Sequence, residues 1–114
     1  MHLITWNIQW GRGIDGRVDL ARMVRSARAM ADFDLLCLQE VAVNFPGLPG
    51  QPDEDQVAQL CDLLPGFHAH FSPATDIEGR EGRRSLFGNL ILSRLPVLQV
   101  FRHLLPWPAD PVVT

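Results

Sequence analysis

Apolar residues recur with two different periods along the chain, and these periods predict alternating strands and helices. Residues 2–8, HLITWNI, are rich in β-branched and aromatic side chains and precede Gly11 and Gly13, which is typical of a strand followed by a glycine-containing loop. After Val18, apolar residues follow the i, i+3, i+4, i+7 spacing of an amphipathic helix, at Leu20, Met23, Val24, Ala27 and Met30. The first third of the chain therefore predicts a strand, a loop and a helix.

Residues 34–41, DLLCLQEV, predict a second strand, because consecutive apolar residues are typical of a strand with both faces covered. A helix of about thirteen residues is roughly as long as a six-residue strand, so it can return the chain for parallel pairing through a right-handed crossover. Asn7 lies near the end of the first strand and Glu40 near the end of the second. We therefore expect both side chains at the same edge of the sheet.

A second helix is predicted after a loop rich in Pro and Gly. Asp53 is a candidate N-cap, and Gln56, three residues later, is its candidate capping-box partner. The helix ends at Pro65 and Gly66, and its apolar stripe consists of Val57, Leu60, Cys61 and Leu64.

The pattern then predicts further strands. Residues 67–71, FHAHF, alternate as a half-buried strand does, and residues 72–85 are polar and charged, which indicates a loop. Residues 86–93, LFGNLILS, predict a strand that forms a hairpin with residues 97–103, VLQVFRH. No internal repeat or domain boundary is found, so residues 1–114 are expected to form part of a single α/β domain with helices on a mixed sheet.

Composition narrows the class of protein. Hydrophobic residues make up 46% of the 114 residues and charged residues 20%, which is typical of a soluble globular domain. The net charge of −3 gives no general attraction to nucleic acid, although several arginines occur in one region, at Arg80, Arg83, Arg84 and Arg94. Cys37 and Cys61 are expected to be buried apolar residues, and no signal peptide or membrane span is recognised, so a cytoplasmic location is expected.

Asn7 and Glu40 are the residues most suggestive of chemistry. Ligands of open α/β sheets bind at the carboxyl ends of the strands, where both residues are expected. Oxygen ligands of this kind suit Mg²⁺, which commonly uses one or two carboxylates together with a substrate phosphate. Two structural alternatives remain open for Glu40, an ion pair with an arginine or simple exposure at a strand end.

Other residues admit weaker functional readings. His68 and His70 share a strand face, but two histidines without a third ligand do not complete a zinc site. The arginines near residue 83 fit a solvated loop better than a phosphate contact. Trp6 is expected in the core, and the role of Trp10 is open, with base stacking as one alternative.

A dinucleotide-binding domain is an alternative fold. Gly11, Gly13 and Gly16 match the G-x-G-x-x-G spacing between a strand and a helix. Four residues separate the strand from these glycines, however, and Asp19 lies at the helix start that would receive a pyrophosphate.

Three segments together resemble a known family. ITWNIQ at the start of the chain, LLCLQEV about thirty residues later and FGNLILSR near residue 90 resemble the first three landmarks of the endonuclease/exonuclease/phosphatase superfamily, the deoxyribonuclease-like hydrolases. The resemblance implies a four-layer αββα sandwich, of which this chain is the first half. It also implies hydrolysis of phosphate esters, nucleic acid among them, with Mg²⁺ or alternatively Mn²⁺.

The resemblance also assigns residues. Glu40 matches the metal-binding Glu of the family, and Asn7 matches the Asn that assists metal and phosphate binding. Asn89 is either a substrate contact or a structural hydrogen-bonding residue. The later family motifs, Gly-Asp-x-Asn and a terminal Asp-His pair, are absent, so activity is expected to need a missing C-terminal half. A non-catalytic α/β interaction module is the alternative from another functional class.

Overall fold

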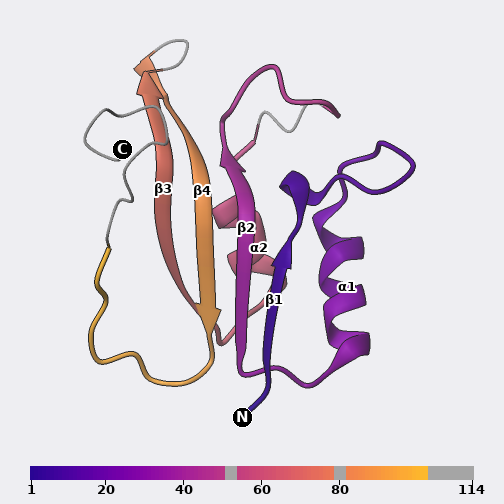
Figure 1. Ribbon diagram of the computed structural model, residues 1–114, viewed down its shortest axis with the longest axis vertical. Helices are drawn as coiled ribbons and strands as arrows, with labels where there is room; N and C mark the ends of the chain where they lie inside the picture. Colours follow the sequence, from indigo (N-terminus) through magenta and orange to yellow (C-terminus); the bar gives the residue numbers. More distant parts are fainter. Residues whose placement is uncertain (51–53, 79–81, 103–114) are drawn as a thin grey trace, which may run out of the picture.

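The part of the chain that the structure describes forms a mixed four-stranded sheet with two helices (Figure 1). The computed structural model describes residues 1–50, 54–78 and 82–102. The order of the strands across the sheet is β1-β2-β4-β3. The elements are β1 Leu3–Asn7, the 3-10 turn η1 Gln9–Gly11, α1 Leu20–Met30, β2 Leu35–Val43, α2 Gln56–Leu63, β3 His68–Glu78 and β4 Arg84–Ser93.

The predicted strand, helix and strand at the start of the chain are confirmed. α1 begins after Asp19, whose side chain accepts a hydrogen bond from the backbone N–H of Arg22 at 3.0 Å. β1 and β2 pair in parallel, with Leu3 opposite Leu35 and Asn7 opposite Gln39. The crossover therefore brings the carboxyl end of β1 beside the middle of β2.

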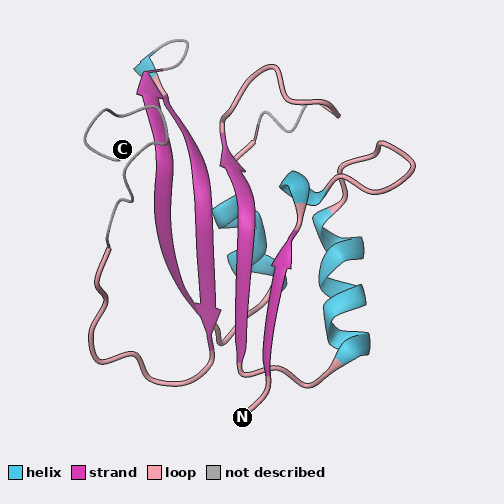
Figure 2. Cartoon of the chain, viewed as in Figure 1, coloured by secondary structure: helices cyan, strands magenta, loops and turns pink. Residues whose placement is uncertain are grey.

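Both helices cover one face of the sheet (Figure 2). Trp6 packs against the same buried cluster, as expected, and so do Ile4 and Phe71. The cluster joins residues from the helices and from the inward faces of the strands, including Leu20, Met23, Val24, Ala27, Leu36, Leu38, Leu60, Leu90 and Leu92. On the opposite face, which we call the open face, Leu3 is 52% and Ile91 44% exposed. Burial of one face alone explains why exposed and less exposed residues alternate along β1 and along residues 89–92 of β4.

β3 is longer than the sequence indicated. Residues 72–78 were expected in a charged loop, but they extend the strand to Glu78 and pair with β4. β3 is an edge strand, so Pro73 removes no ladder hydrogen bond that the interior of the sheet requires. A register shift between Pro73 and Thr75 accommodates the change.

The expected hairpin between residues 86–93 and 97–103 is wrong. β4 pairs with β2 on one side and with β3 on the other, so both of its edges are already used. Residues 97–102 form no strand in the structure, and His103 lies outside the described residues. Arg102 instead donates from Nε to the carbonyl of Phe71 at 2.9 Å.

The predicted capping of the second helix is also wrong. Asp55 is the N-cap of α2 and accepts a hydrogen bond from Ala58 N–H at 3.0 Å, whereas Asp53 lies outside the described residues. Gln56 is therefore the first helical residue, and its buried side chain makes tertiary contacts. Its Oε1 accepts from Ala42 N–H at 3.1 Å, and its Nε2 donates to the Trp10 carbonyl at 2.8 Å. Gln56 thus links α2 to β2 and to η1.

Ion pairs connect three segments at the amino end of the parallel strands. Arg94 contacts Asp34 at 2.7 Å and Asp32 at 2.8 Å, and the His2 backbone N–H donates to Asp34 at 2.8 Å. The His2 N–H and Arg94 together lower the pKa of Asp34 below its ordinary value of 3.8. The network ties the start of β1 and the end of β4 to the loop before β2.

Two further expectations concern the cysteines and membrane spans. Cys37 and Cys61 are free thiols, as expected, and each is partly buried rather than fully buried. Burial raises the pKa of both thiols. Among the described residues, no helix is long and apolar enough to cross a membrane.

We predict that Gln56→Leu destabilises the fold by about 1–3 kcal/mol, because it leaves the buried N–H of Ala42 without an acceptor. Chemical denaturation measures the change. Gln59→Leu on the same helix is the matched control, since Gln59 is only partly buried and contacts the exposed Glu54. Equal losses of stability in the two variants would contradict the role assigned to Gln56.

We predict that Asp34→Asn lowers the melting temperature most near neutral pH. The pKa of Asp34 is depressed in the folded state, so its contribution is complete above 3.8 and disappears as pH falls through the lower folded value. The difference between the variant and the unmodified protein should therefore shrink in strong acid. Thermal unfolding followed by circular dichroism measures it, with Asp62→Asn on α2 as a control for removing one surface charge. A difference that does not depend on pH would disprove the linkage.

Candidate active site

A β-bulge in β2 places Glu40 in an unusual position. Leu38 pairs with Leu90 and Val41 with Gly88, so Gln39 and Glu40 together stand opposite the single residue Asn89. Leu38 and Val41 both belong to the buried cluster under the helices. The two bulged residues between them are therefore available to the open face. The strand also continues to Val43, so Glu40 lies within the strand and not at its end.

The bulge brings three predicted residues into one row across the sheet. Asn7 of β1 is paired with Gln39, and Gln39 and Glu40 face Asn89 of β4. Asn7 alternates with the inward-facing Trp6, and Asn89 with the inward-facing Leu90, so both point to the open face. The row continues to Ser72 of β3, the partner of Asn89. Asn7, Glu40 and Asn89 thus come from three neighbouring strands.

Unfavourable backbone conformations gather around this row. Among the described residues, positive φ angles outside glycine occur at Gln9 (47°), Trp10 (48°), Glu40 (61°) and Asn44 (48°). Two of them follow Asn7 closely, and a third is Glu40 itself. Such conformations cost about 1–3 kcal/mol each and concentrate at functional sites. The strain therefore marks this end of the sheet independently of any sequence motif.

The side chain of Asn7 is oriented by the turn that follows it. Its Oδ1 accepts a hydrogen bond from the backbone N–H of Gln9 at 3.2 Å. The amide NH₂ makes no hydrogen bond to another described residue, and Asn7 is exposed. Asn7 can therefore present two N–H donors to a bound anion.

The carboxylate of Glu40 forms no ion pair or hydrogen bond with the described part of the chain. The alternative of an arginine partner is therefore wrong for the described residues, and exposure at a strand end is wrong because Glu40 is partly buried within β2. All the lone pairs of the carboxylate remain available for an external ligand.

Sequence reasoning missed two residues near the row. Gln39 donates from Nε2 to Thr5 Oγ1 at 3.1 Å and to the Cys37 carbonyl at 3.2 Å. The only sequence feature that could have drawn attention to Gln39 is its position immediately before Glu40. Ser72 was missed because it fell in the expected loop. Arg84 is the first residue of β4, so it does not lie in a solvated loop. Its Nε donates to Asp76 of β3 at 2.8 Å.

His68, His70 and Trp10 are the other candidate residues. The described residues contain no group of three or more His, Cys, Asp or Glu side chains arranged to hold a metal ion. Trp10 packs against Phe87, with ring centroids 6.2 Å apart, and donates to the Pro49 carbonyl at 2.8 Å. These contacts give Trp10 a structural role beside the row.

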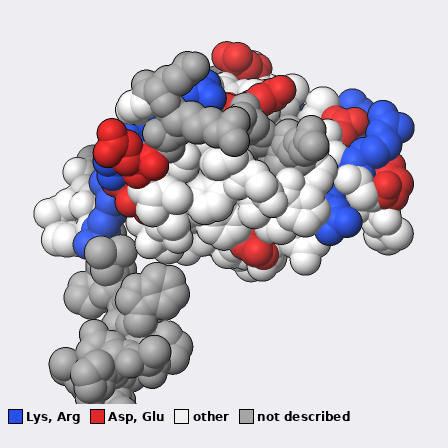
Figure 3. All heavy atoms as spheres, turned by 90° about the horizontal axis from the view of Figure 1, so that it is seen from above, with Lys and Arg blue, Asp and Glu red and all other residues white. Residues whose placement is uncertain are grey.

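The charged side chains are mixed on the end of the molecule that Figure 3 shows. Acidic and basic side chains alternate around the visible face, and uncharged residues occupy much of its middle. Arg22 pairs with Asp15 at 2.8 Å and lowers the pKa of that carboxyl to about 2. The visible arrangement of described residues does not form the broad basic surface that binding of long DNA favours.

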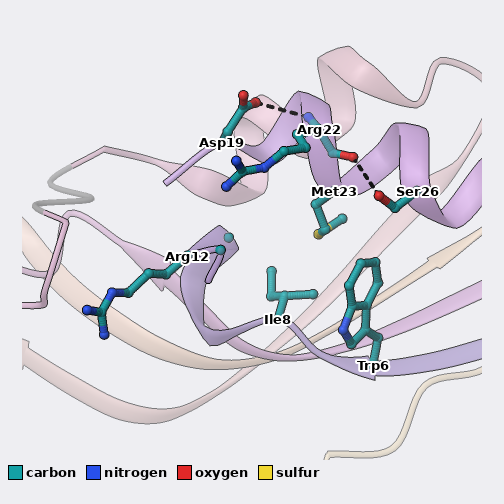
Figure 4. Close-up of a pocket in the computed structure, with 9 residues that line it drawn as sticks. Trp6, Ile8, Arg12, Asp19, Arg22, Met23 and Ser26 are labelled. Carbon is teal, nitrogen blue, oxygen red and sulfur yellow. Dashed lines mark hydrogen bonds between the residues drawn. The ribbon is translucent and has the colours of Figure 1, made fainter. Parts of the chain in front are cut away.

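A cavity of about 150 Å³ lies on the helix side of β1 (Figure 4). Trp6, Ile8 and Met23 supply its apolar surface, and Arg12 points away from them. The polar groups of Asp19 and Ser26 are used within α1, where Asp19 caps Arg22 N–H and Ser26 donates to the Arg22 carbonyl. The cavity is on the face opposite Asn7 and Asn89, so it is separate from the row.

In the loop between β1 and α1, Gly11 allows the backbone to pack closely against α1. A Cβ at Gly11, where φ is +78°, would lie 2.8 Å from the side chain of Leu20. The N-terminus of α1, where a pyrophosphate would bind, is capped by the carboxylate of Asp19. The dinucleotide-binding alternative is therefore not supported by the local structure.

Comparison with known proteins shows which family the chain belongs to. A sequence model of the endonuclease/exonuclease/phosphatase family matches residues 4–112. The crystal structure of an endonuclease/exonuclease/phosphatase from Beutenbergia cavernae DSM 12333 is 36% identical in sequence and superposes with a TM-score of 0.67. The match covers 86% of this chain and 27% of that one, so the chain spans about a quarter of its length. No curated protein matches the chain. The family match over nearly all the residues shows that the chain belongs to the endonuclease/exonuclease/phosphatase family.

Proposed function

We propose that the chain is the N-terminal part of a divalent-metal-dependent phosphoester hydrolase. The observation that carries the proposal is the strand register that brings Asn7, Glu40 and Asn89 into one row, with the Glu40 carboxylate unpaired among the described residues. Family membership supports a hydrolase of the nuclease or phosphatase type. The row supplies the residues with which this chain would take part in the hydrolysis.

The donor set fits a hard cation. Glu40 supplies one carboxylate with free lone pairs, and amide oxygens lie in the same row, so the available ligands are oxygens. Mg²⁺ commonly binds through one or two carboxylates together with water and phosphate oxygens, and Mn²⁺ accepts the same ligand type. A divalent cation supplies Lewis acidity to phosphate and lowers the pKa of bound water.

We assign the residues of the row two roles, cation binding and orientation of the phosphate. We assign Glu40 to cation binding, because its carboxylate has no internal partner in the described chain. We assign Asn7 to binding a phosphate oxygen through its NH₂, because its own oxygen is engaged by Gln9. Asn89 is exposed on β4 beside the bulge and is a second candidate donor to the substrate. Both amides would orient a phosphate group against Glu40 without adding negative charge.

The open face indicates how the remainder of such an enzyme would associate. Leu3 is 52% and Ile91 44% exposed on that face, and the matched protein from Beutenbergia cavernae is several times longer than this chain. We propose that a C-terminal part packs on the open face around Leu3 and Ile91 and leaves the row at the edge of this contact. It would complete a four-layer sandwich and supply the groups for the attacking water and the leaving oxygen. A non-catalytic interaction module that binds another partner through this face is the competing outcome.

Glu40→Gln should abolish Mg²⁺-dependent cleavage of bis-p-nitrophenyl phosphate by the complete gene product, with a loss of at least about 100-fold in kcat/KM. The change removes the charge and keeps the shape, so folding should persist. Calorimetric titration of Mn²⁺ should show the same loss. Glu78→Gln is the matched control, because Glu78 is exposed at the far end of β3. Full activity in Glu40→Gln would refute the assignment, and no activity in the unmodified gene product would favour the interaction module.

Asn7→Asp should separate phosphate binding from metal binding. The carboxylate still accepts from Gln9 N–H and preserves η1, but it offers no N–H donor and repels phosphate. Inorganic phosphate should therefore inhibit the variant about 10-fold less well, whereas its Mn²⁺ affinity should not fall. Inhibition constants and Mn²⁺ titrations measure the two effects. A parallel loss of both affinities would instead place Asn7 among the metal ligands.

A further inference from the structure

We propose that Gln39 is a positioning residue that, together with Thr5, fixes the spacing between Asn7 and Glu40. The inference rests on the proposed function, because it concerns the same row. It assigns a role to two residues whose side chains need not touch metal or substrate.

Gln39 holds β1 on both sides of Asn7. Its side-chain Nε2 donates to Thr5 Oγ1, two residues before Asn7, at 3.1 Å. Its backbone carbonyl accepts from Ile8 N–H, one residue after Asn7, at 3.1 Å. Asn7 itself is the register partner of Gln39. The position of Asn7 relative to β2 is therefore fixed by contacts that converge on one residue.

Gln39 immediately precedes Glu40, the residue of β2 that has a positive φ angle. Glu40 has a φ of 61°, and the pairing between β2 and β4 shifts register at this point. A bulge interrupts the regular ladder, so backbone pairing alone restrains it less than the rest of the strand. Gln39 Nε2 also donates to the Cys37 carbonyl at 3.2 Å, which engages both hydrogens of the amide. The restrained side chain therefore anchors the residue next to Glu40.

The exposure of Thr5 argues against a purely structural explanation. Water can replace a lost hydrogen-bond partner of an exposed hydroxyl, so the fold of this part of the protein does not require the contact to satisfy a buried group. Burial of Leu36 and Leu38 under the helices holds β2 in any case. The contact fixes the spacing between the two strands at the bulge, and this spacing matters for a ligand held by residues of both β1 and β2.

Thr5→Val removes the hydroxyl and keeps the shape, and Gln39→Met removes the donor and keeps the length. We expect each variant to bind Mn²⁺ about 10-fold more weakly in calorimetric titrations of the complete gene product. The double variant should be no weaker than the poorer single variant, because both changes remove the same contact. Thr5→Ser restores the hydroxyl and should bind as the unmodified protein does.

Ser93→Ala is the control for a general structural loss. Ser93 is buried at the other end of β4, where its Oγ donates to the Leu95 carbonyl at 2.9 Å. This variant should lower the melting temperature and leave Mn²⁺ affinity unchanged. Unchanged affinity in Thr5→Val and Gln39→Met, or failure of Thr5→Ser to restore it, would overturn the positioning role.

Amide hydrogen exchange gives a readout that does not depend on metal. Thr5→Val and Gln39→Met should speed exchange at Ile8 N–H, which donates to Gln39, and leave exchange at Leu92 unchanged. If the unmodified gene product binds no Mn²⁺, the metal-binding proposal fails, and the exchange rates then decide the inference. Faster exchange at Ile8 alone supports positioning of Asn7, and unchanged exchange contradicts it.

Discussion

The parallel pairing of β1 with β2 is the constraint on which the candidate site depends. The core below the sheet fixes this pairing, because Ile4 and Trp6 of β1 and Leu36 and Leu38 of β2 face the same helices. A slip of one residue would turn these side chains away from the core, so the register is strongly specified. Asn7 is carried to the open face by the same alternation, opposite Gln39.

The bulge at Gln39 and Glu40 avoids the burial of a carboxylate that a regular strand would cause. Regular alternation after Leu38 would place Glu40 on the helix side, where an unpaired carboxylate is costly. The additional residue in the bulge returns Val41 to the core and leaves Glu40 available to the open face. The left-handed conformation of Glu40 is the backbone cost of this arrangement.

Several features were readable from local sequence, and others required knowledge of the neighbours. The period of residues 20–30 identified α1, because one face of a helix must meet the core. The extent of β3 was missed, because Pro73 and the charged residues after it resemble a loop, and only the pairing with β4 at the sheet edge makes them a strand. Gln56 was assigned to a cap for a similar reason, since its true partners, Ala42 and Trp10, are distant in sequence.

The sequence by itself determined the strand–helix–strand order, the parallel pairing that it implies, and the family to which ITWNIQ, LLCLQEV and FGNLILSR belong. These follow from residue period and from short motifs, which are local properties of the chain. Tertiary structure decided the bulge, the row shared by Asn7, Glu40 and Asn89, the orientation of the Asn7 amide and the contact of Gln39 with Thr5. Each of these depends on register between strands that are remote in sequence, because hydrogen bonding across a sheet is set by neighbouring strands and not by the strand itself.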